Sequence, residues 1–580
     1  MRTQRDLARL FPPLQWARGY DGPTLASDSL AALIVTIMLI PQSLAYALLA
    51  GLPAEMGLYA SILPLAAYAL LGSSRTLSVG PVAVVSLMTA TAVGRLFETG
   101  SAEYAGAAVV MALLSGLMLL GMGLLRFGAL SNFLSHPVVS GFITASGVII
   151  GLSQVRHILG VDAGGDTLPS LCVSLWRALP DTNGVTLLTG ALAIGFLAWA
   201  RGGLQPLLRR AGTGETAAGI LARAAPVAVI AATICASQAA DFQALGVDLV
   251  GAVPRGLPGL AMPPWDARLW SELALSALLI SVIGYVESVS VGRTLAAKRR
   301  QRIDPDQELV ALGAANAASA ISGGFPVTGG FSRSVVNFDA GARTPAASLL
   351  AAAGIALTTL LFTPLLYFLP KAALAATIIV AVSTLIDLHM PLRAWRYSRA
   401  DFIAVATTIG VTLLLGVELG VVAGIASSLA LHLYKTSRPH IAVVGAVPGT
   451  EHYRNVRRHN VITYPNLLSL RVDESLYFAN AGYLQDEIYR QVADNDALEH
   501  VVLQCTGINE IDMSALEALE AVNERLRELG LQLHLSEVKG PVMDRLRDTA
   551  FLRKLSGRVF LTHHRAVNSL KPDDIEPYII

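Results

Sequence analysis

Residues 326–339 read Pro-Val-Thr-Gly-Gly-Phe-Ser-Arg-Ser-Val-Val-Asn-Phe-Asp, which places Arg333 just after a glycine pair and among hydrophobic segments. Gly329 and Gly330 interrupt regular structure, and Ser332 is predicted to cap a new helix. An arginine at membrane depth is costly and usually functional. The unpaired N–H groups of a helix start, together with the guanidinium, therefore predict an anion-binding site. The alternative is that Arg333 lies at a span end and reaches phospholipid headgroups.

The composition is typical of a polytopic membrane protein. Of the 580 residues, 53% are hydrophobic and 15% are charged, and the mean hydropathy is +0.55. We count about thirteen hydrophobic segments between residues 30 and 434, some of them shorter than the roughly 20 residues that a membrane span needs. The protein is therefore expected to contact the lipid bilayer along most of its length.

Two of the hydrophobic stretches are interrupted. The segment 80–96 opens with Gly80-Pro81, and the stretch after residue 323 is broken by glycines before a short apolar run that starts at Phe331. Both are predicted to be half-helices. Such interrupted helices at corresponding positions of two repeats are typical of transporter binding sites.

The basic residues predict that both termini are cytoplasmic. Arginines occur at positions 2, 5, 9 and 18 before the first apolar run, and further basic clusters occur at 201–210, 298–302, 393–399 and 435–438. Cytoplasmic loops carry such an excess of Lys and Arg. With both ends inside, the number of crossings must be even, so hydropathy alone has missed one short segment.

Several classes of function are disfavoured. The formal net charge of +1 argues against nucleic acid as a partner. The three cysteines, Cys172, Cys235 and Cys505, are scattered and predict neither a metal site nor a disulfide framework. The sequence shows no zinc, nucleophile or nucleotide-binding constellation, so we expect neither an enzyme nor a cofactor.

The composition changes after about residue 438. Residues 440–580 contain 20 of the 42 acidic residues, and their apolar runs are short. We therefore predict a transmembrane domain, residues 1–438, and a soluble cytoplasmic domain, residues 439–580. Alternating patterns predict that the second domain is a small α/β fold, with strands at 467–472, 500–504 and 531–536 and helices at 483–492, 514–529 and 541–549.

The first span carries a polar pair. Pro41 opens the helix backbone, and Gln42 and Tyr46 lie four residues apart on one helical face. Contact with a ligand and hydrogen bonding between helices both explain such a pair, and the sequence leaves both open.

The interrupted segment near residue 80 predicts a second helix start. Gly80 allows a ligand to approach closely, and Pro81 is expected in the first helical turn. The N–H groups that follow, at Val82 and Ala83, have no partner within a helix. Paired with Arg333, this helix start could face the same pocket; the alternative is a proline kink that only serves packing.

One carboxylate is well placed to couple protons to an anion. Glu287 lies close to the end of an otherwise uncharged span, and a nearby Arg333 would make its proton occupancy depend on the anion. The alternative is a fixed ion pair with a basic residue such as Arg293. The other acids near spans are expected to be solvated or to pin loops, namely Glu55, Asp387 and Glu418.

These motifs resemble those of the SulP family of anion transporters, most closely its sulfate-permease branch. Residues 41–59, 78–86 and 330–334 resemble the family's first-, third- and tenth-span motifs and occur in the same order. The resemblance implies fourteen membrane segments in two inverted seven-segment repeats, a core domain sliding against a gate domain, and a homodimer. It also implies proton coupling at Glu287 and substrate contacts at Gln42, Tyr46, Pro81, Val82, Ala83, Ser332 and Arg333.

The soluble domain is similar to a STAS domain in the stretch 509–515 before a helix. In antagonist-like STAS domains the position of Ser514 is a phosphorylated serine. Here Met513 precedes it and Ala515 follows it, so we prefer the interpretation that Ser514 caps the helix, with phosphorylation as the alternative. The sequence indicates no particular partner for this domain.

The sequence therefore predicts a secondary active transporter of the plasma (inner) membrane that imports sulfate by proton symport with an elevator-like movement. A C4-dicarboxylate or bicarbonate transporter, and a non-transporting anion sensor that signals through the STAS domain, are the alternatives. The sodium-coupled bicarbonate branch has an aspartate followed by a hydroxyl residue four positions on. This chain has Glu287 and Val291 there, which disfavours a sodium site because hard cations prefer oxygen ligands.

Overall fold

The computed structural model describes residues 12–132, 135–251, 256–361, 363–572 and 578–579. The chain divides into two compact units, Met1–Ser428 and Leu429–Ile580. The boundary predicted at residue 438 falls between the last long helix, which ends at Ser437, and the first strand of the second unit, which begins at Ile441.

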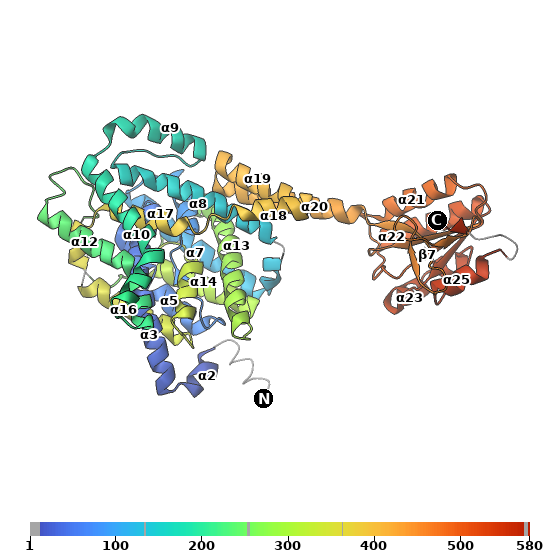
Figure 1. Ribbon diagram of the computed structural model, residues 1–580, viewed down its shortest axis with the longest axis horizontal. Coiled ribbons are helices and arrows are strands. Elements are labelled where there is room, and N and C mark those ends of the chain that lie inside the picture. Colours follow the sequence, from blue (N-terminus) through green and yellow to red (C-terminus); the bar gives the residue numbers. More distant parts are fainter. Residues whose placement is uncertain (1–11, 133–134, 252–255, 362, 573–577, 580) are drawn as a thin grey trace. The chain divides into compact units, whose positions relative to one another are not determined.

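The described residues up to Ser437 form eleven apolar helical segments, and the helices α14, α15 and α19 lie among them in the chain (Figure 1). Seven are long and apolar enough to cross a membrane, counting α4 and α5 as one, and α6, α12, α16 and α17 are shorter apolar helices. In chain order the segments are α3 (Gly22–Leu49), α4 with α5 (Ala54–Tyr59, Leu63–Leu71), α6 (Ala83–Gly94), α7 (Ala102–Leu124), α8 (His136–Leu159), α10 (Gly184–Arg210), α12 (Ala225–Ala239), α13 (Ala267–Lys298), α14 (Pro305–Ile321), α15 (Phe331–Asp339), α16 (Ala346–Leu361), α17 (Lys371–Val382), α19 (Arg399–Leu415) and α20 (Val417–Ser437).

Short elements connect these segments. They are the helices α2 (Pro13–Trp16), α9 (Leu168–Ala178), α11 (Glu215–Arg223) and α18 (His389–Tyr397), and the 3-10 turns η1 (Ala17–Gly19), η2 (Phe127–Asn132), η3 (Leu179–Asp181) and η4 (Thr363–Phe368). The tenth segment, α15, is the short one that hydropathy alone does not find, because it has only 9 residues and is half polar.

The helices of this unit pack in two groups. In the first, α14 packs on α5 and α7, α13 packs on α7, and both α15 and α16 pack on α3. In the second, α8 packs on α10, α17 and α19, and α12 packs on α10 and α17. We call these the first and second helix groups. They meet where α12 and α17 contact α3 and where α6 contacts α8.

The two interrupted segments contain short helices, as expected, and each follows a short strand. The strands β1 (Val79–Gly80) and β2 (Thr328–Gly329) pair antiparallel, with Val79 opposite Gly329 and Gly80 opposite Thr328. The helices α6 and α15 begin within three residues of these strands. The crossing of the two strands therefore places two helix N-termini next to each other, beside α5 and α13.

The structure corrects two details of the predicted helix starts. Pro81 is not in the first turn of α6, because the chain stays extended through Val82, which is the N-cap. Ser332 does not cap α15; Gly330 is the N-cap, and Ser332 is the second helical residue. The extended backbone next to the strand pair thus continues two residues further than predicted before α6 and ends two residues earlier than predicted before α15.

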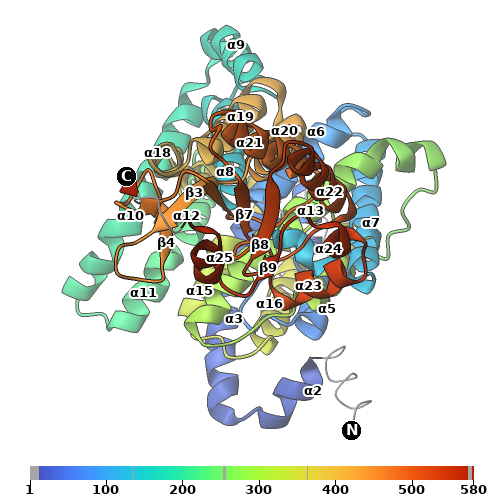
Figure 2. The same cartoon turned by 90° about the vertical axis from the view of Figure 1, so that its right-hand side faces the viewer.

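The second unit is a mixed sheet covered by helices on both faces (Figure 2). The strand order is β10-β5-β3-β6-β7-β8-β9, with β4 paired to β3; β6 to β9 run parallel and β3 is antiparallel to β6. The strands are β3 (Ile441–Ala446), β4 (Tyr453–Asn455), β5 (Ile462–Thr463), β6 (Leu467–Val472), β7 (His500–Gln504), β8 (Gln532–Ser536), β9 (Val559–Phe560) and β10 (Tyr578–Ile579), and the helices are α21 (Ala481–Ala493), α22 (Met513–Glu528), α23 (Gly540–Arg547), α24 (Phe551–Lys554) and α25 (His563–Leu570).

Alternation along the central strands divides the core of this unit between two faces. Val501 and Leu503 of β7 belong to the cluster formed with α21, α22 and α23, whereas Val502 belongs to the cluster formed with α25. Successive side chains of a strand point to opposite faces, so a strand with apolar residues at every position is covered on both. The strands predicted at 467–472 and 500–504 are confirmed, and the predicted helices agree within two residues at each end.

Candidate anion-binding site

The starts of α6 and α15 offer unpaired backbone donors to a common point. The first bond of the α6 ladder runs from the N–H of Ser86 to the carbonyl oxygen of Val82, and that of α15 runs from Ser334 to Gly330. The N–H groups of the preceding residues, from Ala83 and from Phe331 onward, therefore have no partner within their helices. Because each helix start carries about half a positive charge, the strand crossing is an anion-attracting position.

The guanidinium of Arg333 lies at this crossing. It is 2% exposed, and its Nη2 donates to the carbonyl oxygens of Gly80 at 2.7 Å and Thr328 at 3.1 Å. Nε and Nη1 are buried without a hydrogen-bond partner among the described residues. More than half of the guanidinium donors thus remain to be satisfied. The alternative that Arg333 reaches lipid headgroups is wrong, because the side chain is held inside the unit.

Polar side chains of α15 fix the crossing from one side. Ser334 Oγ accepts the N–H of Ser78 at 3.0 Å and donates to the carbonyl oxygen of Gly330 at 2.6 Å. Asn337 Nδ2 donates to the carbonyl oxygen of Thr76 at 3.0 Å. The sequence reasoning missed both residues. Their signal is a polar stripe at three- and four-residue spacing on an otherwise apolar segment.

A second set of hydrogen bonds ties the crossing to α13. The N–H of Gly329 donates to Ser288 Oγ at 2.9 Å, and the hydroxyl oxygens of Ser288 and Thr328 are 2.7 Å apart. Thr328 Oγ1 also donates to the carbonyl oxygen of Gly284 at 2.6 Å. These bonds fix the position of α13 beside β2, and they fix the neighbour of Ser288, Glu287, with it.

Glu287 lies close enough to Arg333 for their charges to interact, and both interact with Tyr46. Its Oε2 is buried without a hydrogen-bond partner among the described residues. An unpaired carboxylate oxygen leaves a position for a proton, as the predicted coupling role of Glu287 requires. The structure thus brings Tyr46, Glu287 and Arg333 together from three helices.

Gln42 and Ser332 line a cavity of about 400 Å³ between the two helix groups. Its other wall is formed by α10, α11, α12 and α17. Val82 lies at the crossing itself, since its Cγ1 is 3.1 Å from the position that a Cβ on Gly330 would occupy. Pro81 and Ala83 flank it in the chain and are buried. The predicted substrate residues therefore divide between the crossing and the adjoining cavity.

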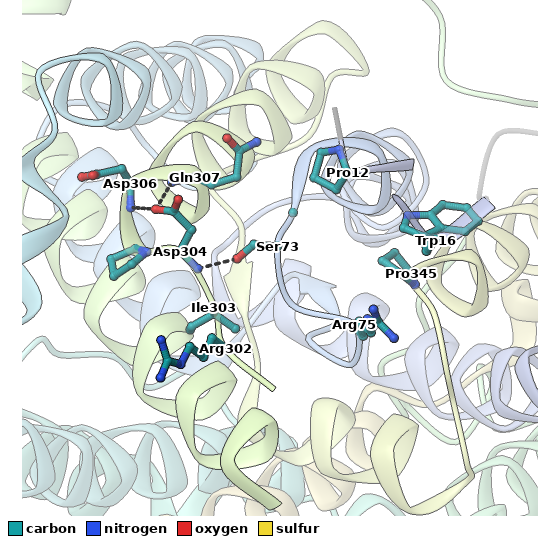
Figure 3. Close-up of a pocket in the computed structure, with 12 residues that line it drawn as sticks. Pro12, Trp16, Ser73, Arg75, Arg302, Ile303, Asp304, Asp306, Gln307 and Pro345 are labelled. Carbon is teal, nitrogen blue, oxygen red and sulfur yellow. Dashed lines mark hydrogen bonds between the residues drawn. The ribbon is translucent and has the colours of Figure 1, made fainter. Parts of the chain in front are cut away.

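Another cavity, of about 520 Å³, contains none of the predicted site residues (Figure 3). Arg75 and Arg302 line it, together with Asp304, whose N–H donates to Ser73 Oγ at 2.9 Å. Next to it, the buried Glu308 accepts bonds from the Tyr68 hydroxyl at 2.7 Å and from Ser73 at 2.7 and 2.9 Å. Both oxygens of Glu308 are engaged, so we assign this carboxylate a structural role in joining α5 to α14.

The remaining acids behave as connectors. Glu418 accepts bonds from Arg95 at 2.6 Å and from Ser276 at 2.7 Å. Asp387 is exposed and accepts the N–H of His389 at 2.9 Å. Glu55 is partly buried in the first turn of α4. Among the residues that the structure describes, no cluster of His, Cys, Asp and Glu has the form of a metal site.

The predicted capping role of Ser514 is wrong. Asp512 is the N-cap of α22, and its Oδ1 accepts the N–H of Ala515 at 2.8 Å. Ser514 is the second residue of the helix and is exposed. Asp512 is the N-cap because it is the last residue with extended backbone, and a capping side chain occupies that position. Phosphorylation of Ser514 stays a prediction.

The chain is similar to known transporters over most of its length. A model of the sulfate permease family matches residues 25–408, and a STAS domain model matches residues 458–566. Sulfate transporter 4.1, chloroplastic, from Arabidopsis thaliana is 36% identical over 551 residues, covering 92% of this chain and 78% of that protein. High affinity sulfate transporter 1 from Stylosanthes hamata is 30% identical over 594 residues, covering 98% and 87%.

Solved structures share the fold. The murine Solute Carrier 26 family member A9 anion transporter, in the inward-facing state, matches with a TM-score of 0.87 at 24% identity, covering 97% of this chain and 94% of that one. The transmembrane domain of the cyanobacterium bicarbonate transporter BicA matches with a TM-score of 0.59 at 19% identity, covering 71% and 98%.

Proposed function

The chain belongs to the sulfate permease family and carries a STAS domain, and from this we propose that it is a secondary active transporter that imports sulfate with protons. The observation that carries the proposal is the guanidinium of Arg333, buried between two helix starts with Nε and Nη1 unpaired. Buried donors of this kind are normally satisfied, and an anion at the crossing would satisfy them.

The charge of the site suits a divalent anion. Two helix starts contribute about +0.5 each and Arg333 contributes a full charge, so the crossing carries about +2 before Glu287 is counted. With Glu287 protonated, this charge balances a sulfate dianion; with Glu287 ionised, it falls to about +1. Proton occupancy at Glu287 would therefore set sulfate affinity, which is the linkage that symport requires.

The division into two helix groups supports an elevator-like movement. The first helix group carries the strand crossing and Arg333, and the second forms the far wall of the 400 Å³ cavity. Sliding of the first group against the second would carry the whole crossing, with its network of hydrogen bonds intact, from one side of the membrane to the other. In this scheme the cavity is the entrance on the cytoplasmic side.

The membrane and assembly that we propose follow from the sequence. The basic loops favour the plasma (inner) membrane with both termini and the STAS domain in the cytoplasm. A homodimer follows from the family resemblance. The apolar side chains exposed on α10 and α20 would then face lipid or the second protomer.

Labelled-sulfate counterflow in proteoliposomes tests the function. The protein should accumulate labelled sulfate against unlabelled sulfate, and an inward proton gradient should drive net uptake. Excess unlabelled bicarbonate or succinate should compete weakly; strong competition by either would assign the transporter to that anion instead. Saturable sulfate binding without counterflow would contradict transport and favour the anion sensor.

A further inference from the structure

The cavity that contains Gln42 and Ser332 has a charged group on its opposite wall. Of the described side chains that line it, only Arg201 of α10 is charged, and the polar groups around it are those of Gln205, Thr377 and Thr384. Among the side chains that the structure describes, no carboxylate lines the cavity opposite Arg201. The cavity adjoins the proposed anion site and combines one positive charge with neutral polar groups. Such a lining attracts an anion.

Arg201 is anchored to the second helix group. Its Nη1 donates to Ser383 Oγ at 3.2 Å, and its Nη2 donates to the carbonyl oxygen of Val380. Both acceptors lie at the C-terminal end of α17, where a cation is stabilised by the free carbonyl groups. These bonds use part of the guanidinium and leave the rest of its donors toward the cavity, where the side chain is exposed.

Arg201 lies within α10 and not at its end. It lies nine residues before Arg210, the last residue of α10, which at about 1.5 Å per residue places it roughly 13 Å inward from the helix end. Capping α17 alone would not require the side chain to line the cavity beside Gln42 and Ser332.

We propose that Arg201 is a second anion contact, fixed on the second helix group, which an anion meets in the cavity on its way to or from Arg333. This rests on the proposed function, because it takes the crossing at Arg333 as the transport site. Arg333 moves with the first helix group and Arg201 does not. Arg201 therefore strengthens anion binding only while the crossing is open to this cavity, and it sets the apparent affinity on that side of the membrane.

Sulfate exchange measured separately in everted and right-side-out membrane vesicles tests the inference. Arg201→Gln should raise the KM for sulfate about tenfold on the cavity side, with the KM on the other side and the maximal rate within about twofold of wild type. Arg201→Lys should recover most of the affinity, since the charge remains. Arg209→Gln is the matched control, because Arg209 lies on the same helix, pairs with Glu215 and does not line the cavity.

A purely structural role of Arg201 gives a different pattern. Ser383→Ala removes one hydrogen bond between Arg201 and the end of α17 but leaves the charge, so it should keep the wild-type KM. If it raises the KM as Arg201→Gln does, the loss of this hydrogen bond, and not the loss of the charge, explains the effect of Arg201→Gln. If Arg201→Gln does not reach the membrane, Gln205→Arg decides, because a second charge on the same wall should lower the cavity-side KM severalfold. An unchanged or higher KM in that variant overturns the proposal.

The two proposals fail in distinguishable ways. A wild-type protein that exchanges sulfate on neither side contradicts sulfate transport itself. Wild-type exchange with an unchanged KM in Arg201→Gln contradicts only the second anion contact.

Discussion

Arg333 donates from Nη2 to the carbonyl oxygen of Gly80 at 2.7 Å, across 253 residues of sequence. This bond joins the two interrupted segments where each turns from strand to helix. It also holds the guanidinium close to Gly80, since a Cβ on Gly80 would lie 2.8 Å from Nη1, while Nε and Nη1 have no hydrogen-bond partner among the described residues. This hydrogen bond thus links the two segments at the crossing and uses only Nη2, so Nε and Nη1 stay unpaired among the described residues.

Removing the charge at the crossing should abolish sulfate binding. Arg333→Ala deletes the full positive charge between the two helix starts, so sulfate affinity should fall on the order of a hundredfold. Arg333→Lys should retain part of the affinity, because the charge survives but the planar fork does not. Isothermal titration of the purified protein with sulfate measures both variants. If Arg333→Ala binds sulfate with wild-type affinity, the anion site is not at Arg333.

The position of the guanidinium should matter as much as its charge. A Cβ on Gly330 would lie 2.7 Å from Arg333 Nε, so Gly330→Ala must displace the side chain although the backbone there, at φ −85°, suits any residue. We expect about a tenfold loss of sulfate affinity in a folded protein. Gly121→Ala is the control, since nothing lies within 4 Å of its added Cβ. Equal affinities in the two variants would show that Nε does not contact the anion.

Proton coupling should depend on Glu287. Glu287→Gln mimics the protonated carboxyl, so uptake driven by an inward proton gradient should collapse while sulfate exchange without a gradient survives. The pH dependence of sulfate binding should flatten in the same variant, because a titrating neighbour is lost. If the variant still concentrates sulfate from a pH gradient alone, the proton is carried elsewhere.

Truncation should separate binding from turnover. Every proposed ligand contact lies before residue 340, so deletion of residues 439–580 should lower expression or transport rate and leave sulfate binding in place. Binding to the detergent-purified truncated protein is the measurement. A truncated protein that inserts normally but binds no sulfate would mean that the soluble domain shapes the pocket.

The soluble domain should lose stability in mild acid through His563. Burial lowers the pKa of His563 to about 4, and its Nδ1 and Nε2 lie 2.8 and 3.0 Å from Ser536 Oγ and Ser469 Oγ. In the unfolded chain the pKa returns to about 6.5. The unfolded state therefore takes up a proton that the folded state does not, and stability falls as the pH drops from about 6.5 toward 4, by on the order of 3 kcal/mol in total.

Calorimetric unfolding of the full chain between pH 7 and 5 checks this prediction in the transition of the second unit. His563→Gln should reduce the loss of stability with falling pH, at some cost in stability at pH 7. His459→Gln, on the exposed surface, should leave the pH dependence unchanged. The same pH dependence in all three proteins would show that His563 does not titrate on unfolding.

Local sequence determined much of this protein. Long apolar runs predict membrane helices because nothing else satisfies their backbone in lipid, and the glycines before Phe331 and at Gly80 mark the points where two helices are interrupted. Apolar runs such as 500–504, bounded by polar turns, likewise predict the strands of the second unit. Arg333 suggests a functional site because a charge among apolar segments is costly, and its neighbours in the chain do not compensate for that cost.

Tertiary structure decided what those features do. The pairing of Val79 with Gly329 cannot be seen in either segment. It keeps the chain extended through Val82, so that α6 begins at Ala83 and Pro81 lies outside the helix, whereas α15 begins at Phe331, one residue before Ser332. Whether Arg333 reaches lipid or stays inside the first unit depended on the carbonyl groups of Gly80 and Thr328. The place of Arg201 depended on packing of α10 against α17. Such relations join groups hundreds of residues apart, and only the folded chain brings them within hydrogen-bonding distance.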